Sequence, residues 1–230
     1  MGNTAIHLIS SMATRQVLGE LADAWQQNTG HNVRVESVGG VDAAKRIQQG
    51  EPFDIAVLAA DAIAKLATAG KVVAGSEVAL ARSGVAVAVR AGAPVLDIGS
   101  EAALRRAVLA APTVGYSTGP SGVALVSLFE RWGIADELRQ RTVQAPAGVP
   151  VGSLVASGEV ALGFQQLSEL MHLEGIDIVG PLPDAIQITT TFSAAIVAGS
   201  LQVDAGRRFL AFMVSDDAAE AKRRHGMTPA

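Results

Sequence analysis

The sequence predicts an α/β protein with two lobes, each a mostly parallel sheet with flanking helices. Strand-like and helix-like segments alternate along its 230 residues, which is the pattern of right-handed βαβ units. Apolar residues make up 49% of the chain and charged residues 17%, the composition of a globular protein with a sizeable core. The pattern of the first third returns at the end, so we expect the chain to leave one lobe, build a second, and come back.

The first third of the chain predicts three pairs of a strand and a helix. Apolar residues at the 3.6-residue spacing indicate the first helix, and a glycine ends each of the three helices. In order, the expected elements are strand 5–10, helix 14–28, strand 31–38, helix 41–50, strand 53–59 and helix 61–70. Short strands that alternate with such helices form a parallel sheet.

The rest of the chain predicts a second lobe and a return to the first. The expected elements are strand 83–92, helix 97–112, strand 113–117, helix 123–132, a helix around 150–157, strands 161–166, 176–182 and 188–199, and a terminal helix 204–226. We therefore assign 1–81 with 190–230 to the first lobe and 82–189 to the second. Two crossings between lobes predict a hinge, with a ligand cleft between the lobes.

Composition excludes several classes of function. A net charge of −4 without a basic tract argues against a nucleic-acid binder. The chain has no cysteine, and its four histidines share no metal-ligand spacing, so we expect no disulfide, no metal and no cofactor. No apolar run approaches the roughly 18 residues of a membrane span, so the protein is not expected to be membrane-embedded. The first residues show no secretory leader.

Four segments resemble a known family. These are LADAWQQNTGHNVRV (21–35), GEPFDIAVLAADAIAKLATAGKV (50–72), LVASGEVALGFQQLSEL (154–170) and RRFLAFMVSDDAAEAKRRHGMTPA (207–230). In this order they resemble the type 2 periplasmic solute-binding proteins, most closely the molybdate-binding subgroup. The resemblance implies a type II periplasmic-binding-protein fold and a periplasmic monomer whose signal peptide has been removed. It also implies a small anionic ligand that is delivered to the permease of an ABC-type importer.

Four residues depart from the molybdate-binding pattern. Ala13 stands where that subgroup offers a serine, and Gly39 and Gly40 stand where it has a cluster of hydroxyls. Gln166 replaces the tyrosine of the second-lobe strand. A tetrahedral oxyanion held mainly by hydroxyls is therefore not the expected ligand.

The candidate binding residues lie in or near loops that lead from strands into helices. In open parallel sheets the ligand lies beyond the carboxyl ends of the strands, where helix starts favour anions. Four such loops cover 10–15, 37–42, 117–122 and 147–152. The candidate ligand-binding residues are Ser10, Ser11, Arg15, Gly39, Gly40, Arg82, Ser117, Ser121, Val149 and Gln166. The serines could instead cap helices or form turns, and the glycines could serve only as tight connections.

The two arginines point to the chemical class of the ligand. Arg15 stands in the first turn of the first expected helix, where a cation opposes the helix dipole unless an anion offsets it. Arg82 lies at the expected crossing between lobes. Each could equally be a surface arginine with a packed stem. Because guanidinium groups pair with carboxylates in a bidentate way, two arginines with several hydroxyls favour a small polycarboxylate.

Three functions stay open at this point. The first is a substrate-binding protein for an importer. The second is an enzyme on the same fold, since the resembled subgroup also includes an isomerase that interconverts cis- and trans-aconitate by an allylic proton shift. Such a reaction needs an acid and a base, and the polar candidates besides the serines are His7, Glu36, Asp42 and Tyr116. The third is a sensory or scaffolding module that grips the same ligand.

Overall fold

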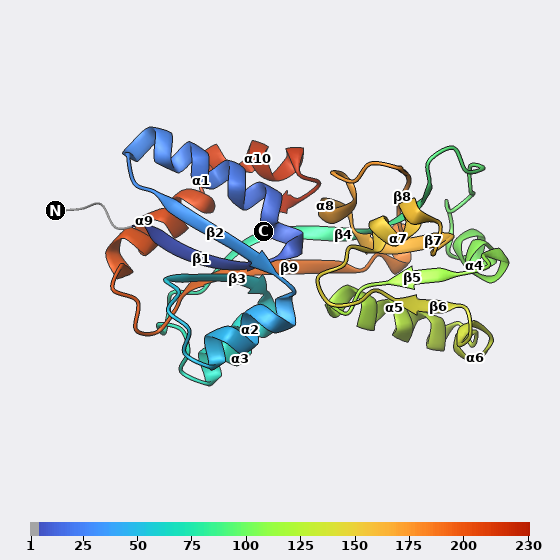
Figure 1. Ribbon diagram of the computed structural model, residues 1–230, viewed down its shortest axis with the longest axis horizontal. Coiled ribbons are helices and arrows are strands. Elements are labelled where there is room, and N and C mark those ends of the chain that lie inside the picture. The colour runs from blue at the N-terminus through green and yellow to red at the C-terminus, as the bar shows by residue number, and fades with distance from the viewer. Residues whose placement is uncertain (1–4) are drawn as a thin grey trace. The chain divides into compact units, whose positions relative to one another are not determined.

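The computed structural model describes residues 5–230, and the chain divides into two compact units (Figure 1). Unit 1 consists of Met1–Arg82 and Thr191–Ala230, and unit 2 of Ser83–Thr190. The chain enters unit 2 within strand β4 (Val78–Arg90) and returns to unit 1 within strand β9 (Thr189–Ile196). Each unit has its own hydrophobic core.

Unit 1 is built on a sheet with the strand order β2-β1-β3-β9. Strand β1 pairs in parallel with β2 and β3, and β9 runs antiparallel to β3. The elements are β1 (Ile6–Ser11), α1 (Arg15–Thr29), β2 (Val33–Val38), α2 (Gly40–Gln48), β3 (Ile55–Ala59), α3 (Ala60–Thr68), α9 (Val203–Met213), α10 (Ala219–Arg224) and β10 (Thr228–Pro229). A short 3₁₀ turn, η1 (Met12–Thr14), connects β1 to α1.

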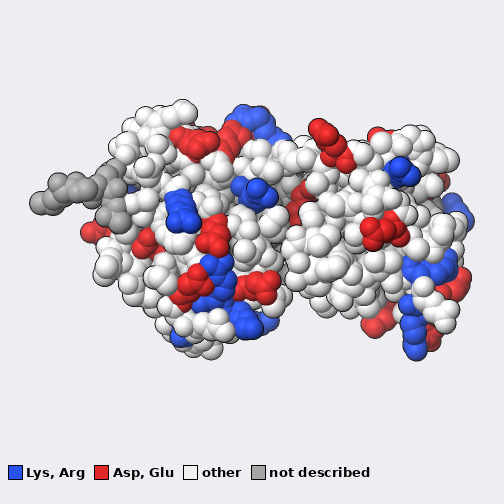
Figure 2. All heavy atoms as spheres, viewed as in Figure 1, with Lys and Arg blue, Asp and Glu red and all other residues white. Residues whose placement is uncertain are grey.

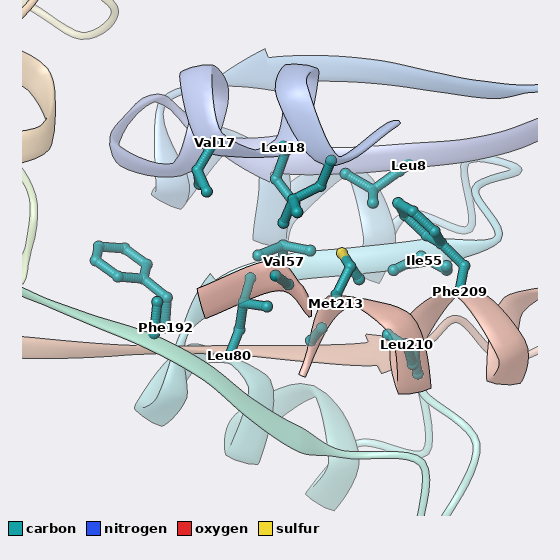
Figure 3. Packing of buried hydrophobic residues seen from close by; sticks show 14 of the residues in the cluster. Leu8, Val17, Leu18, Ile55, Val57, Leu80, Phe192, Phe209, Leu210 and Met213 are labelled. Carbon is teal, nitrogen blue, oxygen red and sulfur yellow. The ribbon is translucent and has the colours of Figure 1, made fainter. Parts of the chain in front are cut away.

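Helices cover both faces of this sheet because its strands are apolar on both sides. On one face, α1, α9 and α10 pack on alternate residues of the strands, such as Leu8 and Val57. Figure 3 shows Leu18 of α1 and Met213 of α9 pointing into this layer from opposite sides. On the other face, α2 and α3 cover a second layer that contains Ile9. The buried strands therefore end at loops that lead directly into helices, which is where the candidate binding residues lie.

Unit 2 also contains a parallel core of strands. Strand β5 pairs in parallel with β6 and β7, while β4 runs antiparallel to β7 and β8. The elements are α4 (Glu101–Ala110), β5 (Val114–Tyr116), α5 (Pro120–Arg131), α6 (Ala135–Leu138), β6 (Thr142–Gln144), α7 (Val151–Ser157), β7 (Leu162–Gln166), α8 (Leu167–Leu170), β8 (Ile176–Pro181) and η2 (Asp184–Ile186). Alternate residues of β4 face different helices, so Val87 lies in the larger core while Ala86 and Ala88 pack beside Leu170.

The structure corrects several expected boundaries. Strand β4 begins at Val78, five residues before the expected start, because its first part pairs with β10. Helix α4 begins at Glu101 and not at 97, since the hydroxyl of Ser100 accepts a hydrogen bond from the Ala103 N–H and caps it there. The terminal helix is two helices, α9 and α10, separated by the 3₁₀ turn η3 (Asp216–Ala218).

Short elements were not expected from the sequence. Helices α6 and α8 have four residues each and strand β6 has three, too few to show a periodic pattern. Within residues 5–230, none of the helices has the length and apolar character required to cross a membrane.

Candidate functional site

The two serines at the end of β1 face opposite sides of the sheet and differ in their partners. Ser10 is fully buried, and its Oγ lies 2.7 Å from the Oγ of Ser37 on the neighbouring strand β2. Ser11 is 8% exposed, and its buried Oγ has no hydrogen-bond partner. A buried hydroxyl without a partner costs free energy, and a bound ligand could remove that cost. Ser11 is therefore the better placed of the two for a ligand.

Neither serine caps a helix, so that alternative interpretation is wrong. Ser11 precedes the turn η1, and its side chain accepts no capping hydrogen bond. The residue that precedes α1 is Thr14, and its side chain accepts none either. The hydroxyl of Thr14 donates instead to the backbone oxygen of Ser11 at 3.2 Å. The backbone of this loop is thus tied down while the Ser11 hydroxyl stays available.

The glycines of the second loop lie beside Ser11. Helix α2 begins at Gly40, and a Cβ added at Gly40 would lie 3.6 Å from the Cβ of Ser11. The Gly39 carbonyl accepts the first helical hydrogen bond, from the Ala43 N–H at 2.9 Å. The structure therefore brings the first and second loops of unit 1 together. The start of the nine-residue helix α2 lies next to the unpartnered hydroxyl of Ser11.

The two arginines are on the surface of unit 1. Arg15 is the first residue of α1, one 3₁₀ turn after β1, and Arg82 lies opposite Thr228 in the pairing of β4 with β10. Both side chains are exposed. Within the described part of the chain, neither guanidinium makes an ion pair or a hydrogen bond. Within residues 5–230, neither arginine forms a hydrogen bond with the Ser11 hydroxyl, so their common role stays a prediction.

The serine loop of unit 2 is tightly packed. The hydroxyls of Ser117 and Ser121 lie 3.4 Å apart where β5 leads into α5. A Cβ at Gly122 would lie only 1.8 Å from the backbone oxygen of Ser117, so this position requires glycine. The structure thus brings the two predicted serines together and explains the glycine that follows them.

The fourth loop offers less than its sequence suggested. The N–H of Val149 donates to the Pro146 oxygen at 3.0 Å, so it already has an acceptor in the chain. The side chain of Val149 is 38% exposed. Val149 could therefore contact a ligand through its apolar side chain but not through its backbone N–H.

Gln166, like Ser11, has a buried polar atom without a hydrogen-bond partner. It ends strand β7 and is 3% exposed. Its Nε2 donates to the Oγ1 of Thr190 at 2.7 Å, while its Oε1 is buried without a partner. Because the threonine hydroxyl can either donate or accept, the amide could turn over and present its NH₂ group in place of its oxygen.

Two further polar residues of unit 2 were not expected from the sequence. Gln165 is 2% exposed; its Oε1 accepts from the Gly152 N–H at 3.2 Å and its Nε2 donates to the Oε2 of Glu169 at 2.7 Å. Burial raises the pKa of Glu169 to about 7, although the hydrogen bond from Gln165 opposes this. The sequence signal was weak: a glutamine that ends an apolar strand, followed four residues later by a glutamate on a short helix.

Glu36, one of the candidate acid–base residues, belongs to an ion-pair cluster, and another candidate, His7, lies beside it with its buried Nε2 lacking a hydrogen-bond partner. His7 Nε2 lies 3.5 Å from Glu36 Oε2, and Arg46 Nη1 lies 2.5 Å from Glu36 Oε1. Arg46 also pairs with Glu51, and these hydrogen bonds hold the pKa of both carboxyl groups below the usual range. Figure 2 shows basic and acidic side chains gathered over β2 and α2. We interpret this cluster as structural.

Of the two other candidates, one lies at a helix start and one at the end of a strand. Asp42 is exposed in the first turn of α2, and Tyr116 ends β5 in a partly buried position. Within residues 5–230, no group of three or more histidine, aspartate or glutamate side chains is arranged to hold a metal ion.

Comparisons with known proteins agree in fold. The sequence profile of the family described as bacterial extracellular solute-binding protein matches residues 6–228. An aconitate isomerase from a Pseudomonas species is 38% identical over 232 residues, which cover 98% of this chain and 88% of that protein. The periplasmic molybdate-binding protein of Azotobacter vinelandii has a TM-score of 0.82 at 22% identity, covering 97% of this chain and 98% of that one. The sulfate-binding protein SubI of Mycobacterium tuberculosis H37Rv has a TM-score of 0.79 at 18% identity, covering 99% and 87%.

These similarities extend over nearly the whole chain and not over a single motif. The two solved structures support the predicted type II fold of two α/β lobes, which is thereby confirmed. The resemblance to the molybdate-binding subgroup is confirmed as a similarity of fold. With a family profile that spans residues 6–228, the chain belongs to the bacterial extracellular solute-binding proteins.

Proposed function

We propose that this protein binds a small tricarboxylate and interconverts trans- and cis-aconitate. The observation that carries this proposal is the aconitate isomerase that is 38% identical over 98% of the chain. This likeness is higher than that to the molybdate-binding and sulfate-binding proteins, at 22% and 18%. The absence of a molybdate-type serine at Ala13 agrees with a different ligand.

The polar groups of each unit support a carboxylate ligand. In unit 1, the hydroxyl of Ser11 is buried and unpartnered beside the start of α2. In unit 2, the amide of Gln166 has one unpartnered atom, and Ser117 and Ser121 offer hydroxyls at the start of α5. Carboxylate oxygens accept several hydrogen bonds each, so a ligand with three carboxylates can use several donors of this kind.

The charge of such a ligand needs cations. We propose that Arg15 and Arg82 supply them, because both guanidinium groups are exposed and uncommitted within residues 5–230. Arginine pairs with carboxylates through two parallel hydrogen bonds, which would fix both the position and the orientation of the ligand.

The proposed reaction moves one proton and one double bond. A base removes a proton from the methylene carbon of trans-aconitate, the double bond shifts by one position, and an acid returns a proton to the former vinylic carbon. Neighbouring carboxylates spread the negative charge that develops in between, and the guanidinium groups would stabilise it. We propose Asp42 as the base and Tyr116 as the acid, because Glu36 is held in an ion pair with Arg46 and His7 Nε2 lies 3.5 Å from that same carboxylate.

A second candidate function is delivery of the same ligand to an ABC-type importer. Its support is membership of a family described as extracellular solute-binding proteins. In this case the protein would act in the periplasm as a monomer that docks on a permease, and closing of the lobes over the ligand would be the signal for transport. The two candidates share the ligand site and differ only in whether the bound tricarboxylate is changed.

Incubation with trans-aconitate, followed by proton NMR, separates the two functions. We expect the cis isomer to accumulate with the wild-type protein and to be lost in Asp42→Asn and Tyr116→Phe, which would still bind the ligand in calorimetry. Tight binding without conversion would leave the importer function and reject the isomerase.

The arginine grip has its own control. Arg15→Ala and Arg82→Ala should each weaken binding of tricarballylate, a saturated tricarboxylate that cannot isomerise, by about tenfold or more. Arg34→Ala serves as the matched control, since Arg34 is another exposed arginine of unit 1. Equal affinities in all three variants would reject the arginines as ligand residues.

A further inference from the structure

Two consecutive glutamines end strand β7 and point to opposite faces of the sheet. In a strand, neighbouring side chains alternate between faces, so Gln165 and Gln166 meet different surroundings. Gln165 reaches the Gly152 N–H in the first turn of α7 and the Glu169 carboxyl on α8. Gln166 reaches Thr190 and leaves one amide atom unpartnered. Gln165 is therefore held at both ends of its amide, whereas Gln166 is the residue that we assign to the ligand.

The orientation of the Gln165 amide is fixed by its partners. A backbone N–H can only donate, so the Gln165 Oε1 must face Gly152, at 3.2 Å. The Nε2 is then left to donate to Glu169 at 2.7 Å. The position of the Gln165 side chain consequently depends on Glu169 as its acceptor, and no such dependence exists for the reversible amide of Gln166.

The surroundings of Glu169 are otherwise without charge. Helix α7 and strand β7 carry no charged residue, and β4 packs apolar Ala86 and Ala88 beside Leu170. On β8, the Asp177 carboxylate accepts from the Gly92 N–H instead. The nearest ionisable residues along the chain are His172 and Glu174, both exposed. Within residues 5–230 Glu169 forms no ion pair. Its hydrogen bond with Gln165 is therefore the contact that changes when the Glu169 carboxyl group gains or loses a proton.

We propose that Glu169 is a positioning residue for the ligand site. Through Gln165, its carboxylate ties the end of β7 to the first turn of α7, and so holds Gln166 where the unpartnered amide atom meets the ligand. This inference rests on the proposed function, because it takes Gln166 to be a ligand residue. It adds a residue that itself touches no ligand and that controls how well the site is formed.

A consequence is that ligand affinity depends on pH near neutrality. An ionised carboxylate accepts a stronger hydrogen bond than a neutral carboxyl group. Burial raises the pKa of Glu169 to about 7, so the strong form of the bond is present above this pH and is lost as the pH falls below it. We expect the affinity for a tricarboxylate to fall by about fivefold over this range, the effect of weakening one charge-assisted hydrogen bond.

Calorimetry with tricarballylate between about pH 6 and pH 8 tests the inference. We expect the wild-type protein to lose affinity as the pH falls, with a midpoint near 7. Glu169→Gln, which cannot titrate, should have a flat profile relative to the wild type. The matched control is Glu174→Gln, which removes the same charge from an exposed position and should keep the wild-type profile.

Two results would overturn the inference. The first is a Glu169→Gln variant that keeps the wild-type pH profile. The second is a wild-type affinity that rises as the pH falls, since the carboxylate would then act by repelling the anionic ligand directly and not by positioning Gln166.

The side-chain amide signals of Gln165 and Gln166 in NMR test the same coupling without ligand. Both should shift with a midpoint near pH 7 in the wild-type protein and stay constant in Glu169→Gln. If these signals titrate but tricarballylate binds at no pH, the proposed ligand is wrong and the coupling stands. If tricarballylate binds but neither its affinity nor the amide signals respond to Glu169, the positioning role alone is rejected.

Discussion

The helix starts of the two units look alike in sequence and differ in how they are packed. In unit 1, a Cβ added at Gly40 would make an ordinary contact, 3.6 Å from the Cβ of Ser11. In unit 2, a Cβ at Gly122 would lie 1.8 Å from the backbone oxygen of Ser117. The first glycine leaves room beside a helix start, whereas the second is required by the close approach of two backbone segments.

One polar side chain of each unit shows a similar difference. The Ser11 hydroxyl in unit 1 has no partner, whereas Gln165 in unit 2 uses both ends of its amide within the chain. A ligand site needs both space and a polar group without a partner in the chain. A closely packed side chain whose hydrogen bonds are all made, such as Gln165, can instead hold a neighbouring residue in position. A glycine after a strand therefore indicates a ligand site only when the space beside it is also open.

The largest expected effect comes from filling the tight position. Gly122→Ala should lower the free energy of unfolding by about 3 kcal/mol or more, since the new methyl group meets a backbone oxygen that cannot move aside. Chemical denaturation followed by circular dichroism measures this. Gly119→Ala in the same loop is the control, because its Cβ would lie 3.7 Å from the Ser117 hydroxyl and its φ of −77° suits alanine. Equal stabilities of the two variants would contradict the packing difference.

A smaller effect is expected from the buried carboxyl group of unit 2. Folding raises the pKa of Glu169 from 4.5 to about 7, so the ionised form is disfavoured in the folded protein. The free energy of unfolding should therefore fall as the pH rises from about 4.5 to about 7, and the cost is fully present above this range. Glu169→Gln removes it and should stabilise the protein by about 2 kcal/mol at pH 8, with little change at pH 4.5. A variant less stable than the wild type at pH 8 would show that Gln165 needs the carboxylate more than burial penalises it.

Long elements could be predicted from the sequence because they rest on periodicity. Helix α1 was expected over 14–28 and covers Arg15–Thr29, and strand β7 was expected over 161–166 and covers Leu162–Gln166. The split of the terminal helix was missed, since the apolar positions continue through the turn at Asp216–Ala218. Short elements such as α8 carry no periodic signal at all.

The positions of the candidate serines at strand ends could be predicted from the sequence, whereas their hydrogen-bond partners could not. The serines at the ends of β1 and β5 were named from the strand-to-loop pattern, but which hydroxyl lacks a partner depends on the neighbouring strand. The Ser37 hydroxyl on β2 forms a hydrogen bond with Ser10, whereas Ser11 has no such partner. Nothing in the local sequence distinguishes the two serines. Glu169 escaped notice because its raised pKa follows from burial, which the chain acquires only by folding.

The two serines of β1 allow a test of the polar difference within one unit. Ser11→Ala removes an unpartnered buried hydroxyl and should raise the free energy of unfolding of the ligand-free protein by about 1 kcal/mol. Ser10→Ala breaks the 2.7 Å contact with Ser37 and should lower it by a similar amount. Denaturant titration measures both. If the two variants change stability in the same direction, the Ser11 hydroxyl has a partner and is a poor candidate for the ligand.

The smallest expected effect comes from filling the open position. Gly40→Ala should raise the free energy of unfolding by about 0.5 kcal/mol, because alanine at the start of α2 loses less backbone freedom than glycine and its methyl group makes only an ordinary van der Waals contact, with the Ser11 Cβ. The same methyl group lies beside Ser11, so the affinity for tricarballylate should fall although the fold becomes more stable. Gly122→Ala should instead lose stability and affinity together, since it disturbs the fold of unit 2. A Gly40→Ala variant that gains stability and keeps full affinity would mean that the open space beside Ser11 is not where the ligand binds.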